Sequence, residues 1–163
     1  MKLMHKLPLL FLLFFAVLLG TSFAGEFRVY PGAQQRNDLG GTASGPLERS
    51  LVEEFREENL KTLVYVTSDP FEKVVDFYAA TGNRYRVGAL ERRRGKKLYS
   101  EGKKLEEAFF ILDGAPDLWT SRLWVKVQNP LIEKVKGEAL DREYQNIRNL
   151  TAIVLVDRRK SVQ

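Results

Sequence analysis

Apolar residues follow a helical period in the middle of the chain, directly after a Thr-Ser-Asp-Pro sequence. They are spaced i, i+3, i+4 and i+7, so they form one stripe along a helix: Phe71, Val74, Val75 and Tyr78. Asp69 and Glu72 have the spacing of a capping box, and Pro70 suits the first helical turn. Gly82 offers a left-handed stop. The pattern predicts a helix over residues 70–80 whose stripe packs on a sheet.

Runs of apolar and β-branched residues predict about five strands. They cover residues 61–67, 83–90, 105–112, 121–128 and 150–156. A short edge strand is also predicted near Tyr30, before a Pro-Gly pair. In the fourth strand Leu123, Val125 and Val127 alternate with more polar positions, so one face is expected to be buried and the other partly wet.

A second amphipathic helix is predicted between residues 46 and 60, where Leu47, Leu51 and Phe55 lie four residues apart. Residues 131–149 are charged and weakly periodic, which favours a long loop or a poorly defined helix. These elements predict an α+β fold: one domain with a mixed or antiparallel sheet of about five strands and two packed helices.

The start of the chain has the pattern of a secretory signal peptide. Lys2 and Lys6 precede an apolar run from Leu7 to Leu19. Small residues at Ser22 and Ala24 favour cleavage before Gly25. The protein is therefore expected to be exported, to the periplasm or the extracellular space, with no transmembrane span after cleavage. The predicted organisation is a signal peptide at 1–24, an N-terminal strand and flexible loop at 25–45, the α+β domain at 46–157 and a solvated tail at 158–163.

Three chemically versatile residue types are missing from the chain after the signal peptide. The sole histidine is His5, the methionines are Met1 and Met4, and there is no cysteine. This excludes Ser-His-Asp and Cys-His catalysis, thiol redox chemistry and zinc sites of ordinary composition. We therefore expect no enzymatic activity, no cofactor and no metal, with a carboxylate-dependent hydrolase as the enzymatic alternative.

Positive charge is concentrated between Arg84 and Lys104, where nine basic residues face two acidic ones. The candidate anion-binding residues are the densest part of this stretch, and we call them the basic segment: Arg92, Arg93, Arg94, Lys96 and Lys97. They are predicted to lie at the tip of a hairpin with Gly95 in its turn. Either they bind phosphates of lipopolysaccharide or phospholipid, or they protect a sheet edge from pairing with other chains. Export argues against nucleic acid as the partner.

Two further groups of residues are candidate sites. Asp69, Glu72 and Asp76 could form an acidic cluster for general acid or base chemistry, but capping and solvation account for them. Trp119 and Trp124 could form a platform for stacking on a sugar, whereas large aromatic residues in a chain without cysteine usually serve the core. Both groups are interpreted as structural.

Three segments, "VYPGA", "VYVTSDPFEKVVDFY" and "NLTAIVLV", resemble a pattern found in small exported bacterial proteins. Such proteins have a Tyr-Pro-Gly-Ala start and a Thr-Ser-Asp-led helix ending in Phe-Tyr, and they are described as hypothetical proteins without an established activity. The resemblance implies export from a bacterial cell and assigns no catalytic or binding residue.

The sequence therefore favours an exported, non-enzymatic accessory or interaction domain of the bacterial cell envelope. Its partner would be another envelope protein or an anionic lipid surface. One alternative is a binder of anionic envelope components through the basic segment, and the second is the carboxylate-dependent hydrolase.

Overall fold

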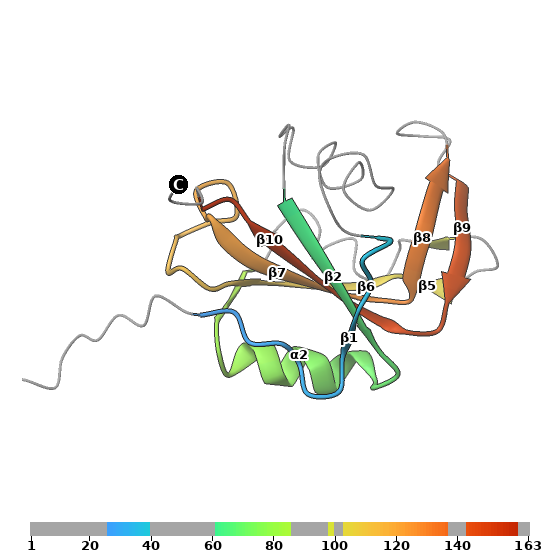
Figure 1. The fold of residues 1–163 in the computed structure, drawn as a ribbon, viewed down its shortest axis with the longest axis horizontal. Helices are drawn as coiled ribbons and strands as arrows, with labels where there is room; N and C mark the ends of the chain where they lie inside the picture. Colours follow the sequence, from blue (N-terminus) through green and yellow to red (C-terminus); the bar gives the residue numbers. More distant parts are fainter. Residues whose placement is uncertain (1–25, 40–60, 86–97, 100–102, 137–142, 160–163) are drawn as a thin grey trace, which may run out of the picture.

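The structure of the protein is a computed structural model that describes residues 26–39, 61–85, 98–99, 103–136 and 143–159. Strands dominate these residues (Figure 1). The elements are β1 (Gln34–Gln35), β2 (Lys61–Thr67), α2 (Phe71–Ala79), β3 (Asn83–Tyr85), β4 (Leu98–Tyr99), β5 (Lys103–Lys104), β6 (Glu106–Ile111), β7 (Leu123–Asn129), β8 (Leu131–Lys136), β9 (Glu143–Arg148) and β10 (Thr151–Asp157). The signal peptide, the predicted helix within 46–60 and the end of the tail lie outside the described residues.

Six strands form one antiparallel sheet in the order β1-β2-β10-β7-β6-β3. β10 lies inside the sheet, where Val154 pairs with Val64 of β2 on one side and with Lys126 of β7 on the other. Two further pairs, β4–β5 and β8–β9, form separate hairpins. Four antiparallel steps separate β2 from β3, so these two strands run in the same direction without being neighbours.

The prediction of an α+β fold with about five strands and two packed helices is wrong. The described part of the chain is mostly β, with ten strands and one nine-residue helix. The largest difference is in residues 131–149, predicted as a loop or weak helix, which contain the β8–β9 hairpin. Charged residues occupy both faces of this hairpin and hide the period of two that would identify its strands.

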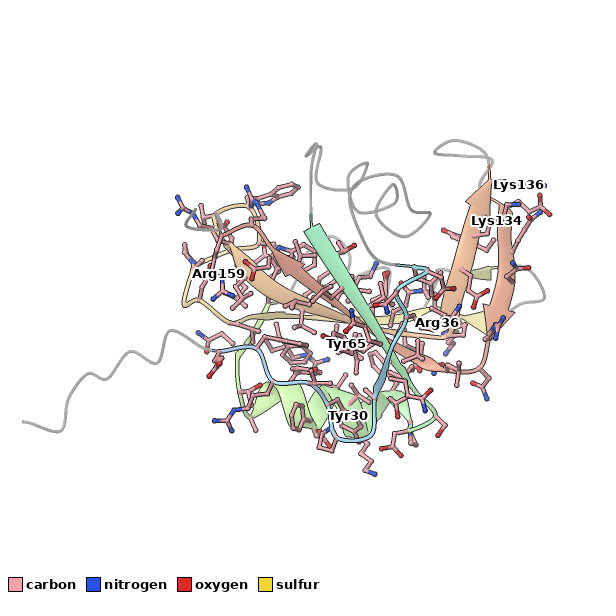
Figure 2. All side chains as sticks on the ribbon, viewed as in Figure 1. Tyr30, Arg36, Tyr65, Lys134, Lys136 and Arg159 are labelled. Carbon is pink, nitrogen blue, oxygen red and sulfur yellow. The ribbon has the colours of Figure 1, made fainter. Side chains whose placement is uncertain are left out.

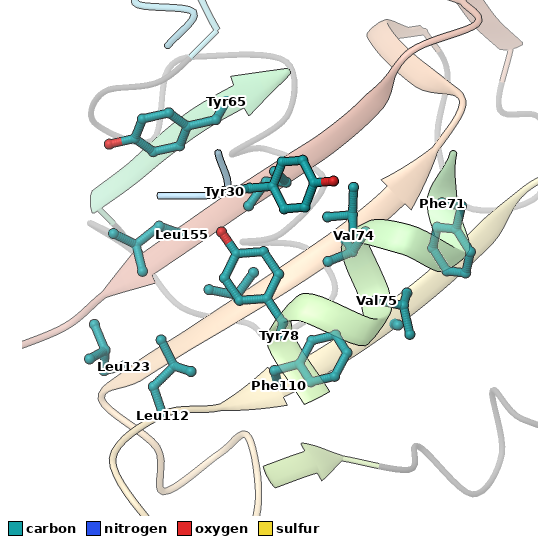
Figure 3. Packing of buried hydrophobic residues seen from close by; sticks show 14 residues of the cluster. Tyr30, Tyr65, Phe71, Val74, Val75, Tyr78, Phe110, Leu112, Leu123 and Leu155 are labelled. Carbon is teal, nitrogen blue, oxygen red and sulfur yellow. The ribbon is translucent and has the colours of Figure 1, made fainter. Parts of the chain in front are cut away.

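Helix α2 buries the stripe that its sequence predicts. Phe71, Val74, Val75 and Tyr78 are all buried, and they pack with residues of β6, β7 and β10 in one cluster (Figure 3). The predicted capping box does not form, because Pro70 occupies the N-cap position and no side chain caps the helix. The helix is thus held by its apolar face rather than by its first turn.

Gly82 follows the helix for a reason other than the predicted left-handed stop. It is not among the glycines with positive φ in the described chain. A Cβ atom at Gly82 would lie 2.7 Å from Leu112 Cδ2 and 3.0 Å from the carbonyl oxygen of Ile111. Glycine is therefore required by the close approach of the chain to the end of β6.

Both faces of β7 are buried, so the expectation of a partly wet face on this strand is wrong. Trp124, Lys126 and Gln128 point away from α2, and each is at most 6% exposed. Lys126 Nζ lies 2.7 Å from Glu107 Oε1, and the Gln128 side-chain amide donates to the carbonyl of Pro130 at 3.1 Å. Polar groups are buried here because they have partners, a condition that strand periodicity cannot reveal.

None of the helices in the described chain is long and apolar enough to cross a membrane.

The predicted edge strand near Tyr30 is displaced along the sequence. The chain turns at residues 30–33, where the Ala33 N–H donates to the Tyr30 carbonyl, and pairing with β2 begins only at Gln34.

Candidate functional site

The five candidate anion-binding residues and the predicted turn at Gly95 lie outside the described residues. The structure does describe the strand pair that follows these residues in the sequence. Directly after the basic segment, β4 pairs with β5, with Leu98 opposite Lys104 and Tyr99 opposite Lys103. The basic segment therefore enters a hairpin whose two strands are separated by residues 100–102.

A small apolar cluster attaches this hairpin to the β8–β9 hairpin. Leu105 follows β5 directly and is buried together with Ile132 of β8. Tyr144 and Ile147 of β9 pack against the same cluster. Figure 1 shows β5 beside β8 and β9 at one end of the molecule. We call the four strands β4, β5, β8 and β9 the hairpin end.

Glu133 anchors the β8–β9 hairpin to the segment after β1. Its side chain is 10% exposed and lies 3.0 Å from Arg36 Nη2 and 3.0 Å from Arg148 Nε. Arg36 also binds Asp38 at 2.6 Å, and this contact lowers the pKa of Asp38 to about 2. The hydrogen bonds that Arg36 donates to Asp38 and then to Glu133 raise the pKa of Arg36 above its usual value. These ion pairs keep β8 in a fixed position.

Strands β5 and β8 of the hairpin end carry exposed lysines. Lys134 and Lys136 are two residues apart on β8, so they share one face, and both are exposed (Figure 2). Across the hairpin they are paired with Gln145 and Glu143. Lys104, next to Leu105, is also exposed. Sequence reasoning missed the two β8 lysines because residues 131–149 were interpreted as a long loop or a poorly defined helix; the spacing of two was the available signal.

The three segments that carry the resemblance meet at one point. Tyr30 of "VYPGA" donates its hydroxyl hydrogen to Asp69 Oδ2 at 2.6 Å, and Lys73 Nζ donates to the same oxygen at 3.0 Å. Thr151 of "NLTAIVLV" donates its hydroxyl hydrogen to the Asp69 backbone carbonyl at 2.7 Å. Asn129 in turn donates to the Thr151 hydroxyl at 3.2 Å. This Asp69 junction joins the N-terminal segment, the helix start and β10.

The electrostatics of the Asp69 junction suit structure rather than catalysis. Hydrogen bonds from Tyr30 and then Lys73 lower the pKa of Asp69, which holds the carboxylate ionised. The hydrogen bond to Asp69 and burial raise the pKa of Tyr30, which keeps the phenol protonated. A general base or nucleophile at neutral pH needs shifts in the opposite directions. Asp69 thus serves this junction, not the predicted helix cap.

Tyr30→Phe is expected to lower stability in a pH-dependent manner. The lowered pKa of Asp69 stabilises the fold above its ordinary value of 3.8, and this contribution is lost as the pH falls through the folded value. The raised pKa of Tyr30 stabilises the fold below 10.0 and is lost at higher pH. Urea unfolding of both proteins should therefore differ most near pH 7, and the difference should shrink as the pH falls below 3.8 or rises above 10.0. Tyr144→Phe is the control, and an equal Tyr30→Phe effect at every pH would contradict the coupling.

A half-open hollow of about 160 Å³ lies beside the start of α2. It is lined by Phe71, Glu72, Arg84, Glu106 and Glu107. The carboxylate of Glu107 binds Lys126, while Glu72 and Glu106 are exposed. A catalytic carboxylic acid usually needs an apolar, enclosed setting that these two lack.

The described residues contain no group of three or more acidic or histidine side chains arranged to hold a metal ion.

The two tryptophans have different environments. Trp124 is 2% exposed and its ring centroid lies 6.1 Å from that of Phe109, so its predicted core position is confirmed. Trp119 is 57% exposed, so its predicted core position is wrong. With one indole buried and the other exposed, the two do not make a joint platform for a sugar.

Comparison with protein-family models, with curated proteins and with solved structures gave no match to this chain.

Proposed function

We propose that this protein is an exported, non-enzymatic interaction domain of the bacterial envelope that binds phosphate-bearing envelope components. The binding surface is the hairpin end together with the basic segment that leads into it: Arg92, Arg93, Arg94, Lys96 and Lys97. The observation that carries the proposal is the cluster of Leu105 and Ile132, which joins the two hairpins. It brings Lys104, Lys134 and Lys136 to the end of the molecule that the basic segment enters.

The chemistry of this surface favours anionic ligands over a catalytic role. Lysine and arginine neutralise phosphate without needing a fixed hydrogen-bond geometry at each contact, and each adds about 1 kcal/mol of attraction near an anionic membrane. The Glu133 anchor keeps β8 in place, so its two lysines need little ordering when they bind. The absence of cysteine, the absence of histidine after His5, and the exposed Glu72 and Glu106 of the hollow support the non-enzymatic assignment.

The proposal predicts salt-sensitive co-sedimentation of residues 25–163 with vesicles that contain phosphatidylglycerol, and with lipopolysaccharide in a parallel arm. Changing the five basic-segment residues to glutamine should weaken binding at least tenfold at low salt, because up to about 5 kcal/mol of attraction is removed. K134Q/K136Q should weaken it by a smaller factor. The two arms distinguish phospholipid from lipopolysaccharide as the source of the phosphate.

A matched control uses cations elsewhere on the molecule. K96Q/K97Q and R28Q/R122Q remove the same charge, and Arg28 and Arg122 are exposed. Arg122 precedes β7 and therefore lies one strand length away from β8. Equal loss in these two variants would reduce the effect to net charge and contradict a defined surface. Absence of binding by the parent protein at low salt would contradict the proposal itself.

A further inference from the structure

The loop between β6 and β7 is held rigidly by hydrogen bonds to its own acidic side chains. The Asp113 carboxylate accepts hydrogen bonds from the backbone N–H groups of Ala115 at 3.3 Å and Leu123 at 3.2 Å, and from the Ser121 hydroxyl at 2.9 Å. It also accepts from the N–H of Arg122. One carboxylate therefore joins both ends of the loop.

The tip of the loop is fixed from two more sides. Asp117 Oδ1 accepts from the Thr120 N–H at 2.8 Å and from the Thr120 hydroxyl at 2.9 Å. The Arg158 guanidinium, which follows β10, donates to the carbonyls of Trp119 and Ser121, both at 3.0 Å. Leu118, the residue before Trp119, is 3% exposed and belongs to the core on the face of the sheet opposite α2. Hydrogen bonds and packing thus hold the backbone on both sides of Trp119 in one conformation.

A side chain as large and apolar as Trp119 nevertheless keeps 57% of its surface exposed on this loop. Tryptophan and arginine are the residues most often found at the energetic centres of protein interfaces. A rigid loop makes such a contact stronger, because little conformational freedom is lost on binding. Arg122 lies three residues further along and is also exposed.

We propose that Trp119 and Arg122 form a preorganised docking site for a second protein, one that presents an apolar pocket for the indole and a carboxylate for the guanidinium. The charges around the loop favour a protein over an anionic membrane. Asp113 and Asp117 lie in the same loop, Arg158 binds its backbone, and Asp157 binds Arg159 at 2.6 Å. Mixed charge around an exposed aromatic residue is typical of a protein interface with a polar rim.

The docking site is separate from the hairpin end. Arg122 and Leu123 mark the start of β7, whereas β8 begins after its end. Figure 2 shows Arg159, which follows β10, and Lys134 of β8 at opposite sides of the molecule. The docking site therefore does not depend on the proposed phosphate-binding function, and a variant at one surface can leave the other intact.

The test uses a phage-displayed library of random peptides, selected on immobilised residues 25–163, a range that contains every described element. Selected phage are depleted on W119A, and the remaining peptides are measured in solution against the parent, W119A, W119F and R122Q. The expected peptides combine apolar and acidic residues. They should bind W119A at least about tenfold more weakly than the parent, W119F at an intermediate strength and R122Q several-fold more weakly at low salt. The melting temperatures should be equal, because the indole is mostly exposed.

Three outcomes would overturn the proposal. The first is that no peptide distinguishes the parent from W119A. The second is that sedimentation velocity shows self-association lost in W119A, which would make a second copy of this chain the occupant. The third is that W119A loses phosphatidylglycerol vesicle binding while no peptide depends on Trp119, which would make the loop a membrane contact.

Discussion

Replacing Val74 by aspartate is expected to unfold the protein. Val74 is fully buried in the cluster between α2 and the sheet. Losing the burial of the valine side chain costs about 1.5 to 3 kcal/mol, and an unpaired carboxylate in this core costs several kcal/mol more. A single domain has a total stability of about 5 to 15 kcal/mol. Circular dichroism during heating should therefore show a transition that is lost or shifted to much lower temperature.

The control for this change is Glu72→Asp, which places an aspartate at an exposed position two residues earlier in the same helix. Its melting temperature should stay close to that of the parent, since surface changes usually alter stability by about 0.5 kcal/mol or less. A Val74→Asp protein that melts like the parent would contradict the packing of α2 on the sheet.

The second large effect is expected at the buried ion pair on the other face of the sheet. Lys126 is 5% exposed, and its Nζ lies 2.7 Å from Glu107 and 5.6 Å from the centre of the Phe109 ring. Lys126→Met leaves the carboxylate of Glu107 without this partner, which costs about 3 to 5 kcal/mol when a buried pair is broken. Urea unfolding at neutral pH should show a midpoint that is clearly lower than that of the parent.

The double variant Lys126→Met/Glu107→Met separates a broken ion pair from simple loss of packing. Replacing both charges with apolar side chains removes the buried carboxylate, so most of the lost stability should return. If the double variant is less stable than Lys126→Met alone, the two residues contribute independently, and the ion pair is not the source of the effect.

The sequence predicts the helix and the strands whose buried residues are mostly apolar. The stripe of α2 and the runs in β2, β6, β7 and β10 were all expected, because hydrophobic periodicity reports burial directly. It fails where burial depends on a partner distant in the chain. Lys126 was expected on a partly wet face, yet Glu107, diagonally across on the neighbouring strand, binds its ammonium group. Asp69 was expected to cap α2, yet Tyr30, 39 residues away, binds its carboxylate.

The candidate surfaces were predictable to different degrees. The charge density of the basic segment is a local property and is visible in the sequence, whereas its neighbours in space are not. Lys134 and Lys136 join that end of the molecule because Leu105 packs with Ile132 and Glu133 binds Arg36, two contacts between segments far apart in the sequence. Trp119 was expected in the core because composition does not reveal that Asp113 closes the loop and leaves the indole outside.

The place of β10 in the sheet has a consequence for the order in which the chain can fold. β10 is the last described strand in the sequence, yet it supplies the pairing partner for both β2 and β7. Its Thr151 also completes the Asp69 junction across 82 residues of sequence. During translocation with the N-terminus leading, β2 and β7 would lack this shared neighbour until β10 had also crossed. For a chain exported as proposed, the six-stranded sheet would therefore close only after passage of β10, so completion of the fold would follow export.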